Sequence, residues 1–178
     1  MTMKWRGWAL TTGVLAISAM AQAAPPTAAM LSNACAGCHG TNGGSAGPSM
    51  PSLAGQSKEA IVDAMTKFKS GARPASVMGR LAKGYSDAEI VAMGEFFSKQ
   101  KFHVTNQSLD PAKVARGASL QEANCSRCHI DDGKEGKDDT PVMASQWLTY
   151  LQIQMADYLT GHRKMPEKMK EKVDPMSK

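Results

Sequence analysis

The chain has 178 residues, with 21 Lys or Arg against 16 Asp or Glu, and its formal net charge at pH 7 is +5. So small a charge does not predict a nucleic-acid-binding protein, in which basic residues usually cluster in a stripe. The composition is unusual in its 13 methionines, because methionine is both an adaptable core residue and a possible metal ligand.

The first 23 residues have the organisation of a signal peptide. Lys4 and Arg6 form a basic start, residues 8–20 are a short apolar run, and Ala21-Gln22-Ala23 has the small residues that a signal peptidase reads. The apolar run is shorter than the roughly 18–20 residues that span a bilayer. We therefore expect cleavage after Ala23, export to the periplasm of a Gram-negative bacterium, and a mature protein without a membrane span.

Two short motifs, Cys35-Ala36-Gly37-Cys38-His39 and Cys125-Ser126-Arg127-Cys128-His129, use every cysteine of the chain. Cys-x-x-Cys-His is the attachment signature of c-type haem, in which the cysteines form thioethers and the histidine binds the iron. A zinc ribbon needs its two pairs about 15–20 residues apart, whereas Cys38 and Cys125 lie 87 positions apart. A redox dithiol or a pair of disulfides does not need the repeated histidine. We predict two covalent haem c groups, attached through Cys35, Cys38, Cys125 and Cys128 and ligated by His39 and His129.

The rest of the chain reads as helical, because it has little of the alternation that is typical of strands. In the first half we expect helices over residues 28–36 and 58–70, and a third from the capping box at Ser86 to about Lys99. In the second half, Asp110 is an N-cap followed by proline, and residues 146–160 form an amphipathic helix. Glycines 71 and 161 close the two equivalent helices.

The two halves align with an offset of 90 residues, which indicates an internal duplication. We expect a signal peptide over residues 1–23, domain one over 24–101, a linker over 102–109 and domain two over 110–178. Domains this small need stabilisation beyond their own apolar core, and a covalent haem would provide it by filling the interior. Beyond the motifs, the aligned pairs are Pro51 with Pro141, Ala54 with Ala144, Gln56 with Gln146, Met65 with Met155, Gly71 with Gly161, and Arg73 with Arg163.

The second half of the repeat ends early. With the offset of 91 that applies after Arg163, Ser86, which opens the last expected helix of domain one, corresponds to Ser177, and the sequence ends at Lys178. We therefore expect domain two to lack its closing helix in this sequence.

A methionine is the expected second axial ligand of each iron. Met65 and Met93 lie in amphipathic helices and are expected in the core, whereas Met50 stays open as a loop candidate. Met78 lies 39 residues after His39 and just before the capping box, from where a loop can cross to the other haem face. In domain two, Met169 lies 40 residues after the motif histidine and is our prediction, with Met165 as the alternative and Lys168 as a third candidate.

With histidine and methionine at both irons, no coordination position is left open for a substrate, and we predict no catalytic residue. The proximal histidine also needs an acceptor for its other ring nitrogen. We expect the Pro48 carbonyl to take this role in domain one, and the aligned Asp138 does not evidently repeat it.

Several segments beyond the haem motifs resemble the di-haem cytochrome subunit of flavocytochrome c sulfide dehydrogenase. The resemblance covers nearly all of the chain after the signal peptide, and it rests on residues 35–41, 47–48, 68–71, 78–86, 146–151 and 163–169. It implies an all-α fold of two tandem class I cytochrome c domains. It also implies a heterodimer with an FAD-containing flavoprotein that oxidises sulfide, from which electrons pass through both haems to an external acceptor such as a soluble cytochrome c.

This chain has no Gly-x-Gly-x-x-Gly motif, so the resemblance places FAD on the partner subunit, and this subunit transfers electrons without catalysing the oxidation. The alternatives are a free-standing di-haem electron carrier of a respiratory chain and a haem enzyme with an open iron. Trp147, Tyr150 and Tyr158 bear on this choice, because they belong either to the core of domain two or to a flavoprotein interface.

Overall fold

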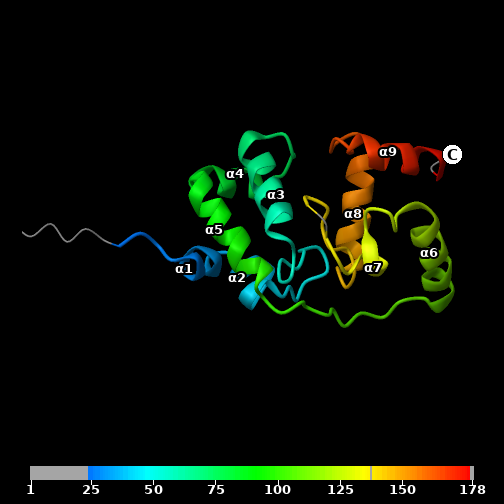
Figure 1. Ribbon diagram of the computed structural model, residues 1–178, viewed down its shortest axis with the longest axis horizontal. Helices are drawn as coiled ribbons and strands as arrows, with labels where there is room; N and C mark the ends of the chain where they lie inside the picture. Colours follow the sequence, from blue (N-terminus) through cyan, green and yellow to red (C-terminus); the bar gives the residue numbers. More distant parts are fainter. Residues whose placement is uncertain (1–23, 137, 177–178) are drawn as a thin grey trace, which may run out of the picture.

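The computed structural model describes residues 24–136 and 138–176, and all regular secondary structure within them is helical. Figure 1 shows two helical domains side by side, with the first and the last described helices toward opposite ends of the molecule. The predicted all-α fold is thereby confirmed. The expected signal peptide lies outside the described residues. None of the described helices is both long and apolar enough to cross a membrane.

Domain one has a core of its own. It comprises the main helices α1 (Ala28–Asn33), α3 (Lys58–Ser70) and α5 (Asp87–Ser98), and the shorter α2 (Ala36–His39), η1 (Thr41–Gly43), α4 (Met78–Leu81) and η2 (Ala82–Gly84). Helix α5 packs against both α1 and α3. Met65 and Met93 are buried there, as predicted. The complete core consists of Leu31, Ile61, Met65, Ala82, Ile90, Met93 and Phe97.

Helix ends in both domains follow local signals in the sequence. Ser86 and Glu89 form the reciprocal capping box at the start of α5, and α3 ends at Gly71, which has a left-handed φ of 80°. The Asp110 carboxylate accepts two backbone N–H groups at the start of the next helix, from Ala112 at 2.9 Å and Lys113 at 3.3 Å. These bonds satisfy N–H groups that have no partner inside the helix.

Domain two has a similar order of helices but buries much less. It comprises α6 (Pro111–Asn124), α7 (Ile130–Gly133), α8 (Leu148–Leu159), α9 (Glu167–Val173) and η3 (Asp174–Met176). Neither α6 nor α8 contains a buried residue. Large apolar side chains are exposed on these two helices, namely Val114, Leu120, Leu148, Ile153 and Leu159. The described helices of domain two therefore leave much of their apolar surface exposed.

Two glutamines join the domains through a reciprocal set of buried hydrogen bonds. Gln56 Nε2 donates to the Val142 carbonyl at 2.9 Å, and Gln56 Oε1 accepts from the Val142 N–H at 2.9 Å. Gln146 makes the same two bonds with Ser52, at 2.7 and 2.9 Å. Because both residues of each bonded pair have a counterpart 90 positions away, an approximate two-fold axis relates the two domains. All four residues are buried.

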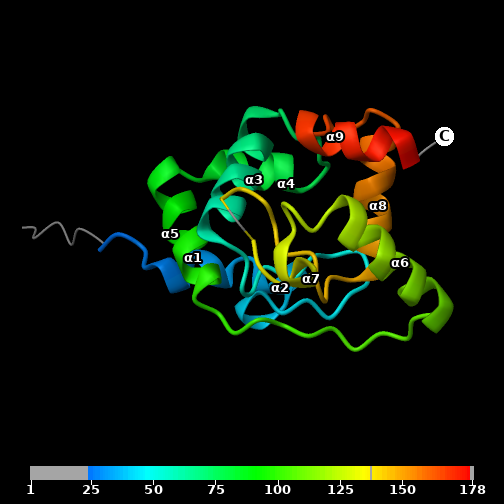
Figure 2. The same ribbon diagram turned by 45° about the vertical axis from the view of Figure 1, so that its right-hand side comes forward.

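The linker follows one side of the molecule as an extended segment, which Figures 1 and 2 show from two directions. Gln107 attaches it to domain two, since its amide bonds the Gln146 carbonyl at 3.0 Å and the Leu148 N–H at 2.9 Å. His103 packs against Gly44, where an added Cβ would lie 2.9 Å from the His103 Nδ1 atom. The linker is therefore packed against both domains.

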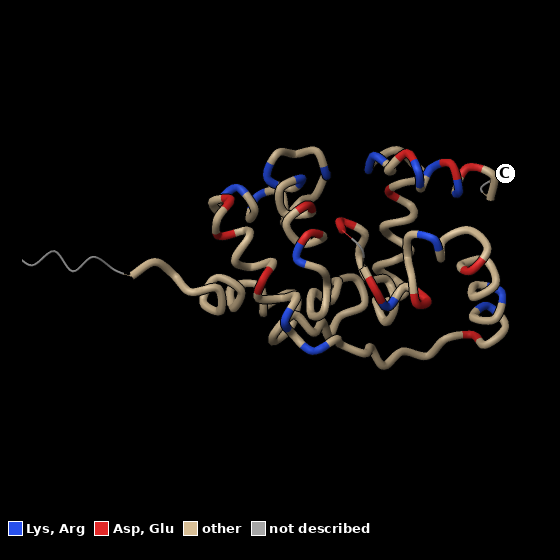
Figure 3. Tube along the Cα trace, in the orientation of Figure 1, with Lys and Arg blue, Asp and Glu red and all other residues tan. Residues whose placement is uncertain are grey.

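The charges differ around the two cysteine motifs. Figure 3 shows a long stretch without charged residues at the start of domain one, and residues 24–57 contain no Asp, Glu, Lys or Arg. The segment after the second motif, residues 130–139, contains five acidic and two basic residues. Acidic and basic residues are interleaved along α3 and α9.

Candidate functional site

The first cysteine motif is held in a single helical turn. The N–H groups of Cys38 and His39 both bond the Cys35 carbonyl, at 3.2 and 2.9 Å. This turn places the two sulfurs three residues apart on one face of the chain, with the histidine beside them. Burial, assisted by the nearby Cys38, raises the pKa of the Cys35 thiol. A redox-active dithiol has the opposite shift, so the raised pKa of Cys35 disfavours that alternative.

His39 is buried and held by a backbone carbonyl. Its Nδ1 atom donates to the Pro51 carbonyl at 2.8 Å, which leaves Nε2 unprotonated as a possible ligand atom. Burial lowers the pKa of His39, although the Pro51 carbonyl partly opposes this shift. The ring is therefore neutral near pH 7, as iron binding requires. The expected acceptor, Pro48, was wrong, because its carbonyl accepts the Tyr150 N–H at 3.0 Å instead.

The second motif repeats this arrangement with one bond missing. The N–H groups of Cys128 and His129 bond the Cys125 carbonyl at 3.1 and 2.9 Å. Burial lowers the pKa of His129, and the Pro141 carbonyl opposes this shift as Pro51 does in domain one. However, His129 Nδ1 is buried without a hydrogen-bond partner, so the approach of Pro141 falls short of a hydrogen bond. The histidine of domain two is thus held less firmly.

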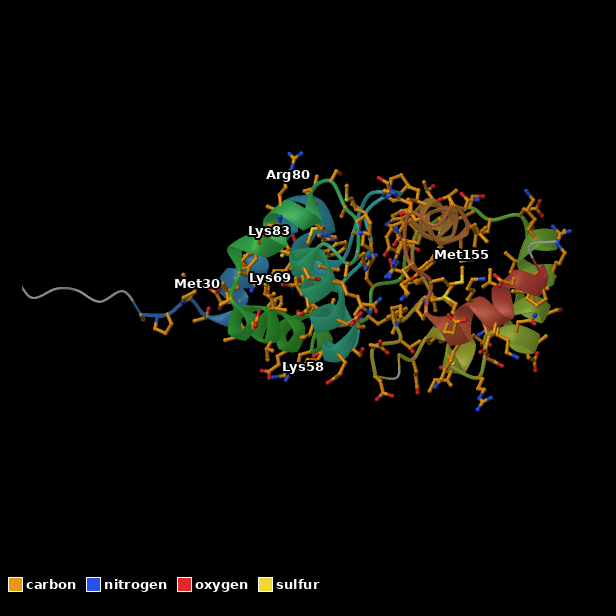
Figure 4. The ribbon with its side chains drawn as sticks, turned by 90° about the horizontal axis from the view of Figure 1, so that it is seen from above. Met30, Lys58, Lys69, Arg80, Lys83 and Met155 are labelled. Carbon is orange, nitrogen blue, oxygen red and sulfur yellow. The ribbon has the colours of Figure 1, made fainter. Side chains whose placement is uncertain are left out.

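Met78 is the predicted second axial ligand of the first iron. It is the first residue of α4, is half-buried, and packs against the core of domain one. Its apolar neighbours Val77 and Leu81 are 54% and 52% exposed. Figure 4 shows Arg80, on the same helix, pointing away from the domain. Met50, the alternative in the loop, is 41% exposed.

Both methionine candidates of domain two lie near α9. Met165 precedes the helix and is buried, whereas Met169 lies in its first turn and is half-buried. Met165 also lines a cavity of about 600 Å³ between the end of α8 and α9. Met169 remains our proposed ligand and Met165 the alternative.

The residues of both domains fit a covalent haem. All four cysteines are free thiols. Among the described residues, no three His, Cys, Asp or Glu side chains are arranged to hold a metal ion. One histidine and one thioether per domain suit an iron that already has four porphyrin nitrogens. The exposed apolar side chains of α6 and α8 would be covered by a large flat apolar ring. Figure 4 places Met155, the half-buried counterpart of the core residue Met65, on α8 within domain two.

Two of the three aromatic residues of domain two contact domain one. Trp147 Nε1 donates to the Ser45 carbonyl at 3.1 Å, and the Tyr150 hydroxyl accepts from Arg73 Nη2 at 3.4 Å. The Arg163 guanidinium stacks on the Tyr158 ring, with its Cζ 4.4 Å from the ring centroid. Trp147 and Tyr150 therefore belong to the interface between the two domains. The sequence analysis had considered only the core of domain two and an interface with a flavoprotein.

Sequence reasoning also missed the interface residues Gln56, Gln146, Arg73 and Arg163. A signal was available, because these polar residues are retained at equivalent positions of the repeat. Such retention has no explanation in the core packing of a single domain. It points to an interface that the duplication itself created.

Comparisons with known proteins agree with this geometry. Residues 26–101 match the family model "Cytochrome c", and residues 112–177 match "Cytochrome C oxidase, cbb3-type, subunit III". The chain is 45% identical over 87 residues to the cytochrome subunit of sulfide dehydrogenase of Chlorobaculum tepidum, a match that covers 49% of this chain and 78% of that protein.

Two further matches extend over both domains. Cytochrome c4 of Pseudomonas aeruginosa is 31% identical over 160 residues, which cover 84% of this chain and 79% of that protein. The crystal structure of reduced cytochrome c4 of Pseudomonas stutzeri superimposes with a TM-score of 0.68 at 26% identity, over 76% of this chain and 81% of that one. The predicted class I cytochrome c fold is confirmed, and the chain belongs to the cytochrome c family as a member with two cytochrome c domains in tandem.

Proposed function

We propose that this chain is a periplasmic di-haem electron-transfer subunit. It accepts electrons from an FAD-containing sulfide dehydrogenase subunit and passes them to an external acceptor such as a soluble cytochrome c. The observation that carries this proposal is the repeated Cys-x-x-Cys-His turn, in which burial lowers the pKa of both histidines, accompanied in each domain by a methionine. The 45% identity to the cytochrome subunit of a sulfide dehydrogenase supports the choice of donor.

Each side chain of the proposed sites has a separate task. The four cysteines hold the haems covalently, and His39 and His129 are the proximal ligands. The Pro51 carbonyl orients His39 through the 2.8 Å hydrogen bond. Met78 and Met169 complete the coordination and favour reduced iron, because a thioether is a soft ligand. When bound, a haem supplies reversible one-electron exchange at its iron.

The interface between the domains is also part of the proposed function. The four bonds of Gln56 and Gln146 fix one domain relative to the other. Electron transfer between two centres needs a constant separation. A hydrogen-bonded, buried interface provides this better than a flexible linker would.

The second candidate function is a free di-haem carrier that works without a flavoprotein subunit. The match to cytochrome c4 favours it, because that match extends over 84% of this chain whereas the sulfide dehydrogenase match extends over 49%. Both functions use the same haem ligands, so haem spectroscopy alone does not separate them.

Purification from the native source separates the two functions. A sulfide dehydrogenase subunit is expected to elute from gel filtration with a flavin-containing protein, and sulfide should reduce its haems in that complex. Elution alone, without flavin absorbance and without reduction by sulfide, would favour the free carrier. Mass spectrometry of the same sample gives the haem count, and fewer than two haems per chain would refute both functions.

A further inference from the structure

Two arginines occupy equivalent positions on the two sides of the domain interface. Arg73 follows α3 and Arg163 follows α8, on loops that lie at the same end of the molecule in Figures 1 and 2. Each backbone N–H bonds a carbonyl six residues earlier, at 3.0 Å in domain one and 2.8 Å in domain two. The Arg73 Cζ lies 4.5 Å from the Phe68 ring centroid, and Arg163 stacks on Tyr158 in the same way. The duplication has kept both the residue and its support.

The two guanidinium groups converge on a single neutral atom. Arg73 Nη2 and Arg163 Nη1 both donate to Gln154 Oε1, each at 2.6 Å. The ion pairs within the described part of the chain are all formed by lysines, so neither arginine forms an ion pair there, although the charge of the nearby Asp157 acts on Arg163. Both arginines are half-buried. Two neighbouring positive charges with reduced access to water are unfavourable unless an anion joins them.

We propose that Arg73 and Arg163 form an oxyanion-binding site across the domain interface. Guanidinium groups match carboxylates and other oxyanions through paired N–H donors. Gln154 Oε1 accepts one donor group from each arginine, and a guanidinium has five N–H groups, so most of their donors are left for a ligand. The Tyr150 hydroxyl, 3.4 Å from Arg73 Nη2, borders the same site.

The oxyanion has two possible sources, the propionate carboxylates of the haems and a free anion from solution. Several features favour the propionates. Residues 24–57, which surround the first motif, contain no cation to balance them. Arg73 lies five residues before Met78, and Arg163 lies six before Met169, so each arginine is on the segment that carries a proposed axial ligand. This source rests on the two haems of the proposed function.

The test uses the full-length protein with both haems attached and compares Arg73→Gln and Arg163→Gln with two controls. Gln154→Ala removes the shared acceptor but keeps both charges, and Arg73→Lys keeps the charge. Redox titration measures the haem potentials, and calorimetric titration with sulfate and with thiosulfate measures free-anion binding. Far-UV circular dichroism checks that each variant is folded.

If the propionates occupy the site, the Arg→Gln variants shift at least one haem potential downward, because loss of a positive charge favours ferric iron. The two controls then stay near the wild-type potentials, and neither anion binds. If a free anion occupies the site, wild type binds sulfate or thiosulfate and the Arg→Gln variants lose at least tenfold in affinity. Unchanged potentials together with unchanged anion binding would overturn the site. The haem count of wild type tests the proposed function separately.

Discussion

Domain one is held together by its own side chains, whereas the described part of domain two keeps the helix order but buries few apolar side chains. In domain one, α5 contributes Ile90, Met93 and Phe97 to the contacts with α1 and α3. The described part of domain two contains no helix equivalent to α5. A cavity of about 300 Å³ lined by Met143, Ser145 and Leu151 lies between α8 and the linker. Within the described residues, the attachment motifs and the interface are therefore more alike in the two domains than the packing of the helices is.

The backbone shows the same contrast. Gly55 of domain one has a left-handed φ of 76°, and its counterpart Ser145 has a φ of 57°. Asp131, two residues after the second motif, is also left-handed, whereas the left-handed Asp132 matches its left-handed counterpart Asn42 in domain one. A residue with a Cβ is strained in this region by roughly 1 kcal/mol. Domain two thus depends more on its haem and on domain one for stability.

The largest expected difference between the domains concerns loss of the haem. The double variant Cys125→Ser/Cys128→Ser should unfold domain two, because covering on the order of 200 Å² of apolar surface stabilises by about 5 kcal/mol. The matching variant Cys35→Ser/Cys38→Ser should leave more helix, because the core of domain one remains. Circular dichroism melting and haem mass compare the two variants. Equal losses of helix would contradict the contrast between the domains.

The axial methionines give the next largest effect. Met78→Ala should abolish the weak sulfur-to-iron absorption band of one haem and lower its potential, because a thioether stabilises reduced iron. Met169→Ala should do the same for the other haem, while Met165→Ala should keep the band. The measurement is the ferric absorption spectrum with a redox titration. Loss of the band in Met165→Ala alone would transfer the ligand role to Met165.

The glutamine interface should respond equally in both domains. Gln56→Leu and Gln146→Leu each leave one buried N–H and one buried carbonyl unpaired, which costs about 2–5 kcal/mol. Gln100→Leu is a matched control, because Gln100 bonds only the Phe96 carbonyl within domain one, at 2.8 Å. Denaturant unfolding of the haem-loaded protein measures the free energies. A loss of unfolding free energy in only one of the two glutamine variants would contradict this prediction, because the two domains would then contribute unequally to the interface.

The smallest expected effect tests backbone strain. Ser145→Gly should stabilise the protein by up to about 1 kcal/mol, because glycine adopts a positive φ without a steric penalty. The reverse change in domain one, Gly55→Ser, should destabilise it by more, since an added Cβ would lie 3.1 Å from the Phe102 Cα. Denaturant midpoints compare the two variants. Stabilisation by Gly55→Ser would refute the assignment of strain.

The sequence alone was sufficient for features that depend on neighbouring residues. The haem motifs, the capping box at Ser86 and the Asp110 cap all involve residues within four positions of one another. Neighbouring residues are therefore sufficient to predict them. The repeat also predicted two helical domains, because both of its copies have a residue pattern that is typical of helices. The ranges assigned to the signal peptide, the domains and the linker remain predictions.

The tertiary structure decided what depends on residues far apart in the chain. The acceptor of His39 is Pro51 because the loop folds back over twelve positions, which spacing could not distinguish from Pro48. The glutamine bonds span 86 and 94 positions, and Arg73 reaches Gln154 across 81. Such contacts form only when both domains are folded and docked. The sequence shows that the two halves of the repeat share these residues. Only the folded structure shows which atoms they bind.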